Sequence, residues 1–288
     1  SYIKPHWPYI VPAPYHDMYG PNSFLPVMRH PDELVDPHPV YAVFSGNVIG
    51  TAFKQDAVRD AALGAYMGLI KQIDDQMGVL FAHLRESGQI DNTVIVITSD
   101  HGDYLGDHWL GEKDLFHDPS VRVPMIIYDP SPEADATRGT VSDALVESID
   151  LLPTFVDMAG GTPRYEWLEG RSLMPLIRGE TPSDWRKYTI SEYDFSITPM
   201  AGRLDLAPKD ARLFMVADDR WKFMHAEGGF PPMLFDLQND PHELNDLCRD
   251  PAYGAAVADC YDRLFEWARR SSQRTTISDQ QIEERRGK

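Results

Sequence analysis

Apolar residues recur at three- and four-residue steps over 56–85, which is the spacing of one face of an α-helix. Ser87 and Gly88 then end the pattern and predict the helix terminus. Thr93–Thr98 is a continuous β-branched run, typical of a strand buried on both faces of a parallel sheet. A long loop rich in Gly, Asp and His follows, and Val123–Tyr128 predicts a second buried strand. This order of elements favours an α/β fold, in which ligands bind beyond the carboxyl ends of the strands.

The second half of the chain shows a different pattern. Short apolar runs predict four strands, at Lys187–Tyr193, Leu213–Val216, Trp221–Met224 and Met233–Leu237. Two of them are separated by little more than an Asp pair, as in a tight turn, so we expect an antiparallel meander. A final helix is predicted over Tyr253–Arg270.

The predicted architecture is therefore α/β: part of a mixed, mostly parallel sheet flanked by helices, followed by a smaller antiparallel sheet with a C-terminal helix. The expected units are 1–185 for the α/β part, 186–270 for the antiparallel subdomain with its helix, and 271–288 for a charged tail. Two parallel strands with apolar faces would expose long edges, so the rest of that sheet is expected from sequence outside this chain. The proline-rich first 40 residues are expected to be extended loop.

Composition excludes several classes of partner. The 288 residues include 45 acidic and 27 basic ones, giving a formal charge of −18. Such a surface repels phosphate backbones and anionic lipid, so neither nucleic acid nor membrane is an expected partner. An anionic substrate would need a local positive island. The apolar runs are too short to span a bilayer. Two cysteines cannot form a disulfide framework and suit a reducing compartment, so we expect a cytoplasmic protein.

The densest chemistry lies directly after the first predicted strand. Asp100 and His101 occupy its carboxyl end, and Gly102 follows. At a turn both side chains can converge on one point, as a metal site requires, and a carboxylate with an imidazole suits a divalent cation. The alternative is that Asp100 caps the loop and His101 is a satisfied, half-buried histidine.

Two cations are candidate catalytic residues. Lys113 lies in the same glycine-hinged loop and can return to the site, where an ammonium would neutralise charge on a tetrahedral oxyanion. His6 lies in a rigid aromatic loop, as suits a histidine that protonates a leaving alkoxide, and Lys4 is a weaker candidate. The alternatives are a surface lysine and a packing histidine.

Other polar residues of this region have no firm assignment. Asp107 and His108 could support the metal-binding pair, but solvation of a loop explains them as well. Asp103, Tyr104 and His117 are possible pocket residues, and Arg122 is expected to form a structural ion pair.

These residues resemble the sulfatase family of the alkaline-phosphatase superfamily, and within it the phosphonate monoester hydrolases and arylsulfatases. The similarity lies in the Thr-Ser-Asp-His-Gly stretch from Thr98, in Lys113, and in the later stretches from Asp150 and from Leu234. Many sulfatases have Asn after the metal-binding Asp, whereas His101 is similar to the phosphonate hydrolase and choline-sulfatase branches.

The resemblance implies roles for four residues. Asp100 and His101 would ligate a single divalent metal ion, calcium or manganese, Lys113 would bind the transferred group, and His6 would assist departure of the leaving group. The family's formylglycine nucleophile and acidic metal ligands would lie upstream, in a missing N-terminal half, so this chain alone is expected to be inactive. The tail is similar to an extension that helps form oligomers, which implies a homo-oligomer.

The sequence thus predicts the carboxyl-terminal part of a metal-dependent hydrolase of sulfate esters or of phosphonate or phosphate monoesters. One alternative is a non-catalytic module that keeps the fold. Another is a phosphodiesterase or phosphomutase of the same superfamily, which would need further metal ligands.

Overall fold

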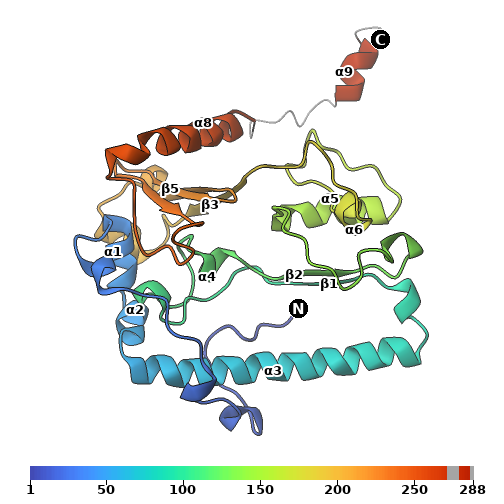
Figure 1. Cartoon of the computed structure of the whole chain (residues 1–288), viewed down its shortest axis with the longest axis horizontal. Coiled ribbons are helices and arrows are strands. Elements are labelled where there is room, and N and C mark those ends of the chain that lie inside the picture. Colours follow the sequence, from blue (N-terminus) through green and yellow to red (C-terminus); the bar gives the residue numbers. More distant parts are fainter. Residues whose placement is uncertain (271–278, 286–288) are drawn as a thin grey trace.

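A long helix, α3 (Asp56–Glu86), runs along one side of the molecule in the computed structural model, which describes residues 1–270 and 279–285 (Figure 1). Its 31 residues confirm the helix predicted from the apolar spacing. Asp56 in the first turn and Arg85 in the last turn stabilise the helix, because their charges are opposite in sign to the partial charges at its two ends. Gly68 lets the N-terminal segment cross closely, because a Cβ there would lie 2.5 Å from the carbonyl oxygen of Tyr15.

The remaining helices are shorter, and the longest of them is α8 with 17 residues. They are α1 (Pro39–Ser45), α2 (Val48–Phe53), α4 (Asp118–Val121), α5 (Leu151–Met158), α6 (Met174–Ile177), α7 (Pro199–Arg203), α8 (Gly254–Arg270) and α9 (Asp279–Arg285). The segment before α1 is loop with short 3₁₀ turns, as its prolines predict. Helices α1 and α2 were not predicted, because elements of seven and six residues are too short to show a clear period.

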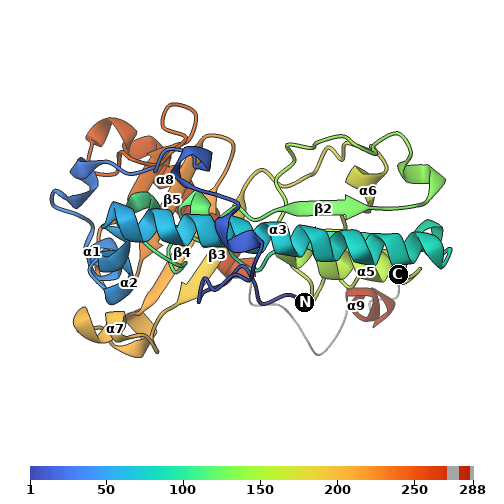
Figure 2. The same ribbon diagram turned by 90° about the horizontal axis from the view of Figure 1, so that it is seen from below.

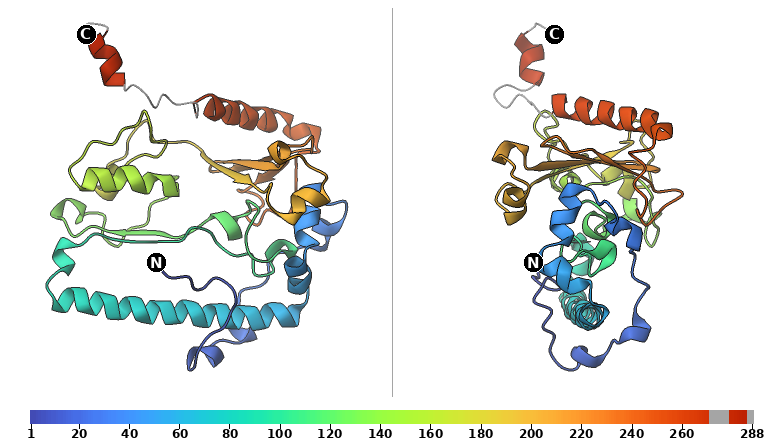
Figure 3. Two further views of the ribbon diagram at one scale, coloured as in Figure 1. Left: turned by 180° about the vertical axis from the view of Figure 1, so that it is seen from behind. Right: turned by 90° about the vertical axis from the view of Figure 1, so that its left-hand side faces the viewer.

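Strands β1 (Ile95–Thr98) and β2 (Met125–Tyr128) lie where the apolar runs predict them, between α3 and α5 (Figures 1 and 3). They pair antiparallel, with Ile95 opposite Tyr128 and Thr98 opposite Met125. The predicted parallel arrangement is therefore not confirmed for the described strands. An apolar β-branched run specifies a strand with two apolar faces, but it does not specify the direction of its neighbour.

This two-stranded sheet leaves apolar surface uncovered. Val94 is 37% exposed and Ile126 57% exposed. An open groove of about 440 Å³ lies between β1 and α5 and is lined by Val94, Val96, Phe155, Met158 and Ala159.

The second sheet is the expected antiparallel meander, in the order β3 (Thr189–Asp194), β4 (Arg212–Ala217), β5 (Trp221–Ala226) and β6 (Met233–Asp236). Helix α8 covers one face of it, where Phe223, Leu234 and Cys260 pack together (Figures 1 and 2). The main core lies on the other side and joins α1, the loop after β1 and this sheet through Val40, Tyr104, Leu115, Met215 and Phe235. One core thus contains residues from both sides of position 185, and the boundary there stays a prediction.

In the described part of the chain, no helix combines the length and apolar character needed to cross a membrane. The predicted tail falls largely on residues 271–278 and 286–288, which lie outside the described residues, with α9 between them.

An ion triad of Lys222, Glu243 and the partly exposed Asp118 connects the second sheet to α4, the helix that follows the long loop after β1. Lys222 on β5 has a side chain only 2% exposed, and its Nζ lies 2.5 Å from Asp118 Oδ1. The same Nζ lies 2.7 Å from Glu243 Oε1, an ion-pair contact without full hydrogen-bond geometry. The other Glu243 oxygen accepts a 2.7 Å hydrogen bond from the backbone N–H of Asp118, at the start of α4. Burial raises the pKa of Glu243, so this carboxylate depends on Lys222 for its charge.

We expect Lys222→Met to destabilise the chain by about 3–5 kcal/mol, because it leaves the buried Glu243 carboxylate without its cation, while Asp118 keeps its contact with Arg122. Urea unfolding measures this change. The exposed Lys209 offers a matched control, and Lys209→Met should change the unfolding free energy by less than about 0.5 kcal/mol. Similar effects of the two substitutions would contradict the structural role assigned to the triad.

Candidate active site

Asp100 and His101 follow β1 directly, where the backbone turns away from the strand. The Asp100 side chain is 88% exposed and that of His101 30% exposed, and His101 Nε2 lies 3.8 Å from Asp100 Oδ2. The backbone N–H of His101 donates to Asp100 Oδ1 at 3.1 Å, which fixes the carboxylate beside the ring. The two side chains therefore present an oxygen and a nitrogen on the same side of the turn.

The tautomer of the neutral His101 ring follows from its backbone contact. Its Nδ1 lies 2.7 Å from the carbonyl oxygen of Gly102, which can only accept, so Nδ1 carries the proton. Nε2 then has a free lone pair, the arrangement typical of a metal-binding histidine whose other nitrogen is held by a carbonyl. Asp100 and His101 thus fit part of a metal shell. Among residues 1–270 and 279–285, no group of three or more His, Cys, Asp or Glu side chains is placed to hold a metal ion.

Gly102 allows the turn that places His101. Its N–H donates to the carbonyl oxygen of Ser120 at 2.7 Å. A Cβ at this position would lie only 2.0 Å from the carbonyl oxygen of Pro119. Only glycine therefore fits where the start of the loop packs on α4.

Lys113 and His6 meet across 107 residues of chain. Lys113 Nζ lies 2.8 Å from His6 Nε2. His6 Nδ1 lies 2.9 Å from the carbonyl oxygen of Trp7, so Nδ1 carries the proton and Nε2 accepts from the ammonium. The His6 ring also meets that of His101 edge-on, with centroids 5.7 Å apart. The structure thus brings together all four residues singled out from the sequence; their roles stay predictions.

A hydrogen bond of Tyr9, a residue that the sequence did not single out, joins the N-terminal segment to the loop. Tyr9 donates to Asp103 Oδ2 at 2.7 Å, while Asp103 Oδ1 accepts from the N–H of Leu105 at 3.1 Å. Burial raises the pKa of Asp103, which these hydrogen bonds oppose. Lys4 does not face a substrate position: its Nζ donates to the carbonyl oxygens of His6 and Pro8 and so shapes the aromatic loop.

Acidic residues also surround Lys113. Glu112 and Asp114 flank it in the chain, and burial raises the pKa of both carboxyls. Tyr193 on β3 donates to Asp114 Oδ1 at 3.0 Å, a contact that no local sequence signal indicates. The described residues therefore form a mixed cluster and do not by themselves make the positive island expected for an anionic substrate. The charge of a bound cation would be needed to complete one.

The remaining residues with open assignments are structural. Asp107 Oδ1 accepts from the N–H of Met28 at 2.9 Å, and the buried His108 contacts Glu33, so neither supports the metal-binding pair or is a solvated loop residue. Tyr104 and His117 are buried against each other. Arg122 forms the expected ion pair, with Asp118, although its side chain is 82% exposed.

Comparison with known proteins decides the family. The sulfatase family model matches residues 1–161, and the model of the N-sulphoglucosamine sulphohydrolase C-terminal region matches residues 106–270. The chain belongs to the sulfatase family. This sulfatase-family chain is 36% identical, over 96% of its length, to the multifunctional alkaline phosphatase superfamily protein PehA of Trinickia caryophylli, and covers 56% of that protein. It is 31% identical to an arylsulfatase of Clostridium perfringens, over 88% of this chain and 49% of that protein.

The solved structures include similar folds. The phosphonate monoester hydrolase SpPMH of Silicibacter pomeroyi superposes with a TM-score of 0.86 at 33% identity, covering 95% of this chain and 56% of that one. The sulfatase-family chain thus spans about half the length of the relatives it matches.

The close packing at Gly102 gives a direct test. We expect Gly102→Ala to destabilise the chain by about 1–3 kcal/mol or more, because its Cβ would overlap the Pro119 carbonyl. Gly78→Ala is the matched control: it lies inside α3, where the added carbon would meet no atom within 4 Å beyond its chain neighbours and the adjacent helix backbone, and it should stabilise by about 0.5–1 kcal/mol. Thermal unfolding of both variants measures the difference. A Gly102→Ala variant as stable as the control would disprove the packing argument.

Proposed function

We propose that the protein to which this chain belongs is a metal-dependent hydrolase of sulfate esters or of phosphonate or phosphate monoesters. The observation that carries the proposal is the contact of Lys113 Nζ with His6 Nε2 at 2.8 Å, with the His101 ring beside them. The names of the similar proteins, an arylsulfatase and a phosphonate monoester hydrolase among them, support this reaction class. Sulfate and phosphonate are both tetrahedral oxyanions that the same few groups can bind.

The residues of this chain divide the work between the transferred group and the leaving group. Lys113 places a fixed ammonium where negative charge accumulates on the tetrahedral group. This lowers the barrier, because the ammonium is already in place and need not move during the reaction. His6 acts at the leaving oxygen as a general acid. Its Nδ1–H bond to the Trp7 carbonyl orients the ring. Nε2, which accepts from the Lys113 ammonium here, takes up a proton and turns to the leaving oxygen when His6 acts as the acid.

Asp100 and His101 would hold a single divalent cation, for which we propose calcium or manganese. When bound, the ion supplies positive charge to the transferred group. The contact of His101 Nδ1 with the Gly102 carbonyl keeps Nε2 available for it. The remaining ligands are assigned to the part of the protein outside this chain.

The nucleophile is assigned there too, as a formylglycine. Neither Cys248-Arg-Asp-Pro nor Cys260-Tyr-Asp-Arg has the Cys-x-Pro/Ala-x-Arg context in which the family forms a formylglycine. As unmodified thiols the two cysteines do not suit the role either, because burial raises the pKa of Cys248 to about 11 and that of Cys260 to about 12. Both thiols therefore stay protonated near neutral pH. We accordingly propose that residues 1–288 alone have no turnover.

The missing part of the protein is also the partner that we assign to the open sheet. The apolar groove between β1 and α5, together with the exposed Ile126, is suited to burial by further elements of an α/β domain. A homo-oligomer and a cytoplasmic location stay predictions from the sequence.

Removing the ammonium tests the assignment of Lys113. In the full-length protein, Lys113→Ala should lower kcat by about 10²–10³-fold and change KM by much less, because the charge acts mainly in the transition state. Steady-state kinetics with aryl sulfate and phosphonate esters provide the measurement. Lys209→Ala, at an exposed position, is the control and should match the wild type. Unchanged turnover in the Lys113 variant would exclude this role, and a wild type inactive on both ester classes would favour a non-catalytic module.

Chelation tests the metal site. Treatment of the full-length protein with a chelator should abolish turnover, and addition of calcium or manganese should restore it. His101→Ala should weaken binding of the restoring metal by about tenfold or more, measured by calorimetric titration. His16→Ala, at a histidine with a side chain 54% exposed, should leave the affinity unchanged. Equal affinities in the two variants would remove His101 from the metal site.

A further inference from the structure

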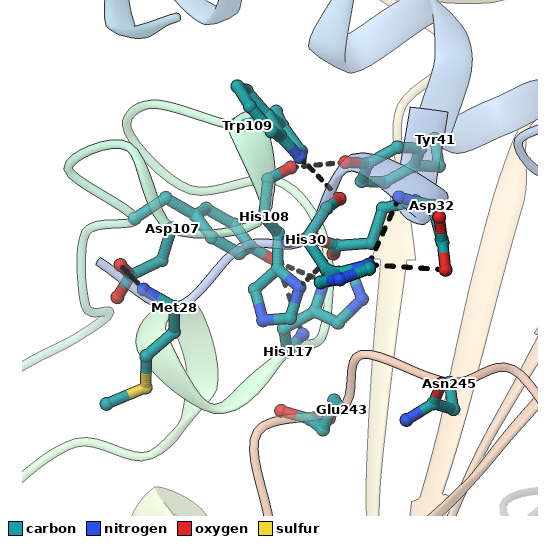
Figure 4. Close-up of polar contacts among 12 residues, drawn as sticks. Met28, His30, Asp32, Tyr41, Asp107, His108, Trp109, His117, Glu243 and Asn245 are labelled. Atoms are coloured by element: carbon teal, nitrogen blue, oxygen red, sulfur yellow. Dashed lines mark hydrogen bonds and ion pairs between the residues drawn. The ribbon is translucent and has the colours of Figure 1, made fainter. Parts of the chain in front are cut away.

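A second polar cluster lies where the loop that carries Lys113 meets the N-terminal segment, and the proposed mechanism does not use it (Figure 4). His108 and His117 stack with ring centroids 4.1 Å apart and planes 19° apart. They are 1% and 3% exposed. Buried imidazoles in such a stack must have their polar atoms satisfied, so their partners show what the cluster does.

The hydrogen bonds assign the state of each ring. His108 Nδ1 lies 2.6 Å from Glu33 Oε1 and donates to it, while Glu33 Oε2 accepts from the N–H of His30 at 2.7 Å. The Tyr104 hydroxyl lies 2.9 Å from His117 Nδ1 and also accepts the N–H of His117 at 3.2 Å. Burial lowers the pKa of His117 well below its usual range, so this ring is neutral and places no positive charge beside His108.

Residues 28–33 and 107–109 form what we call the clamp. In addition to the contact between His108 and Glu33, three hydrogen bonds join the two segments: Met28 N to Asp107 Oδ1 (2.9 Å), His108 N to Met28 O (2.8 Å) and Trp109 Nε1 to His30 O (2.9 Å). The Arg29 guanidinium also lies 4.2 Å from the centroid of the Trp109 ring. Figure 4 shows Met28 and His30 of the N-terminal segment beside Asp107, His108 and Trp109 of the loop.

The clamp joins the two parts of the chain that carry the candidate catalytic residues. His6 belongs to the same N-terminal segment as residues 28–33, and Lys113 lies four residues beyond Trp109. The hydrogen bond from Tyr9 to Asp103 is a second junction between the same parts. The separation of His6 and Lys113 therefore depends on both junctions, of which the clamp is the more deeply buried.

We propose that His108 and Glu33 are positioning residues, whose buried contact holds the loop so that Lys113 lies against His6. The inference rests on the proposed function, in which His6 protonates the leaving oxygen. Neither positioning residue would touch the substrate. Loosening the clamp should therefore matter most for substrates whose leaving group needs a proton most.

The test uses the full-length enzyme with two variants and one control. His108→Phe keeps a ring stacked on His117 but removes the hydrogen bond to Glu33, and Glu33→Gln keeps the shape but removes the charge. Asp36→Asn is the control in the same segment, because Asp36 is 79% exposed and pairs with an exposed arginine, Arg249. Each variant is assayed with aryl esters whose leaving phenols span a range of acidity.

We expect both clamp variants to lose about tenfold in kcat for the poorest leaving group and less than about twofold for the best. The dependence of rate on the acidity of the leaving phenol should become steeper, while KM and metal affinity change little. Asp36→Asn should reproduce the wild-type dependence. An equal loss for every leaving group, or no loss, would overturn the proposal, because a smaller folded fraction lowers all rates by the same factor.

A second measurement separates this proposal from the proposed function. If the wild type hydrolyses none of the esters, the proposed function fails. Hydrogen exchange of backbone amides then tests whether the clamp holds the loop. Peptides covering the loop over 102–117 should exchange faster in both clamp variants, while peptides from α8 exchange as in the wild type. Unchanged exchange in the loop would overturn the clamp.

Discussion

The path of the loop over 102–117 is the constraint on which the candidate site depends. Six of its residues have left-handed backbone angles, and five of them are not glycine: Leu105, His108, Trp109, Glu112 and Asp114. Each such residue costs about 1–3 kcal/mol. The loop therefore keeps this path only because surrounding segments bond to it, and Lys113 lies against His6 as a consequence.

The antiparallel subdomain supports the loop from the other side. Glu243 lies in the stretch after Leu234 that resembles a later signature of the family, and it has a left-handed φ of 55°. Its carboxylate binds Lys222 and the first backbone N–H of α4, directly after the loop. A stretch without a candidate catalytic residue thus holds the end of the loop that carries Lys113.

Charge around the site is balanced rather than positive. Lys113 is surrounded by Glu112 and Asp114, while Asp100 extends an exposed carboxylate toward solvent. An anion would bind poorly to this set alone, since its carboxylates repel it. A divalent cation on Asp100 and His101 reverses the sign locally, which links metal binding to recognition of the substrate.

The sequence by itself determined the local elements and the residue types of the site. The apolar spacing of α3, the runs of β1 and β2, and the four strands of the meander depend on periodicity, which is a local property. The Asp100–His101 pair and Lys113 were found because they cluster within one loop, and His6 because proline and aromatic neighbours indicate a rigidly placed histidine. Only the tertiary structure decided that β1 and β2 pair antiparallel, because strand direction depends on the path of the connection. It also decided the contacts of Tyr9, Glu33 and Tyr193, whose partners lie 75 to 94 residues away. Such contacts leave no local pattern, because they depend on which distant segments the core brings together.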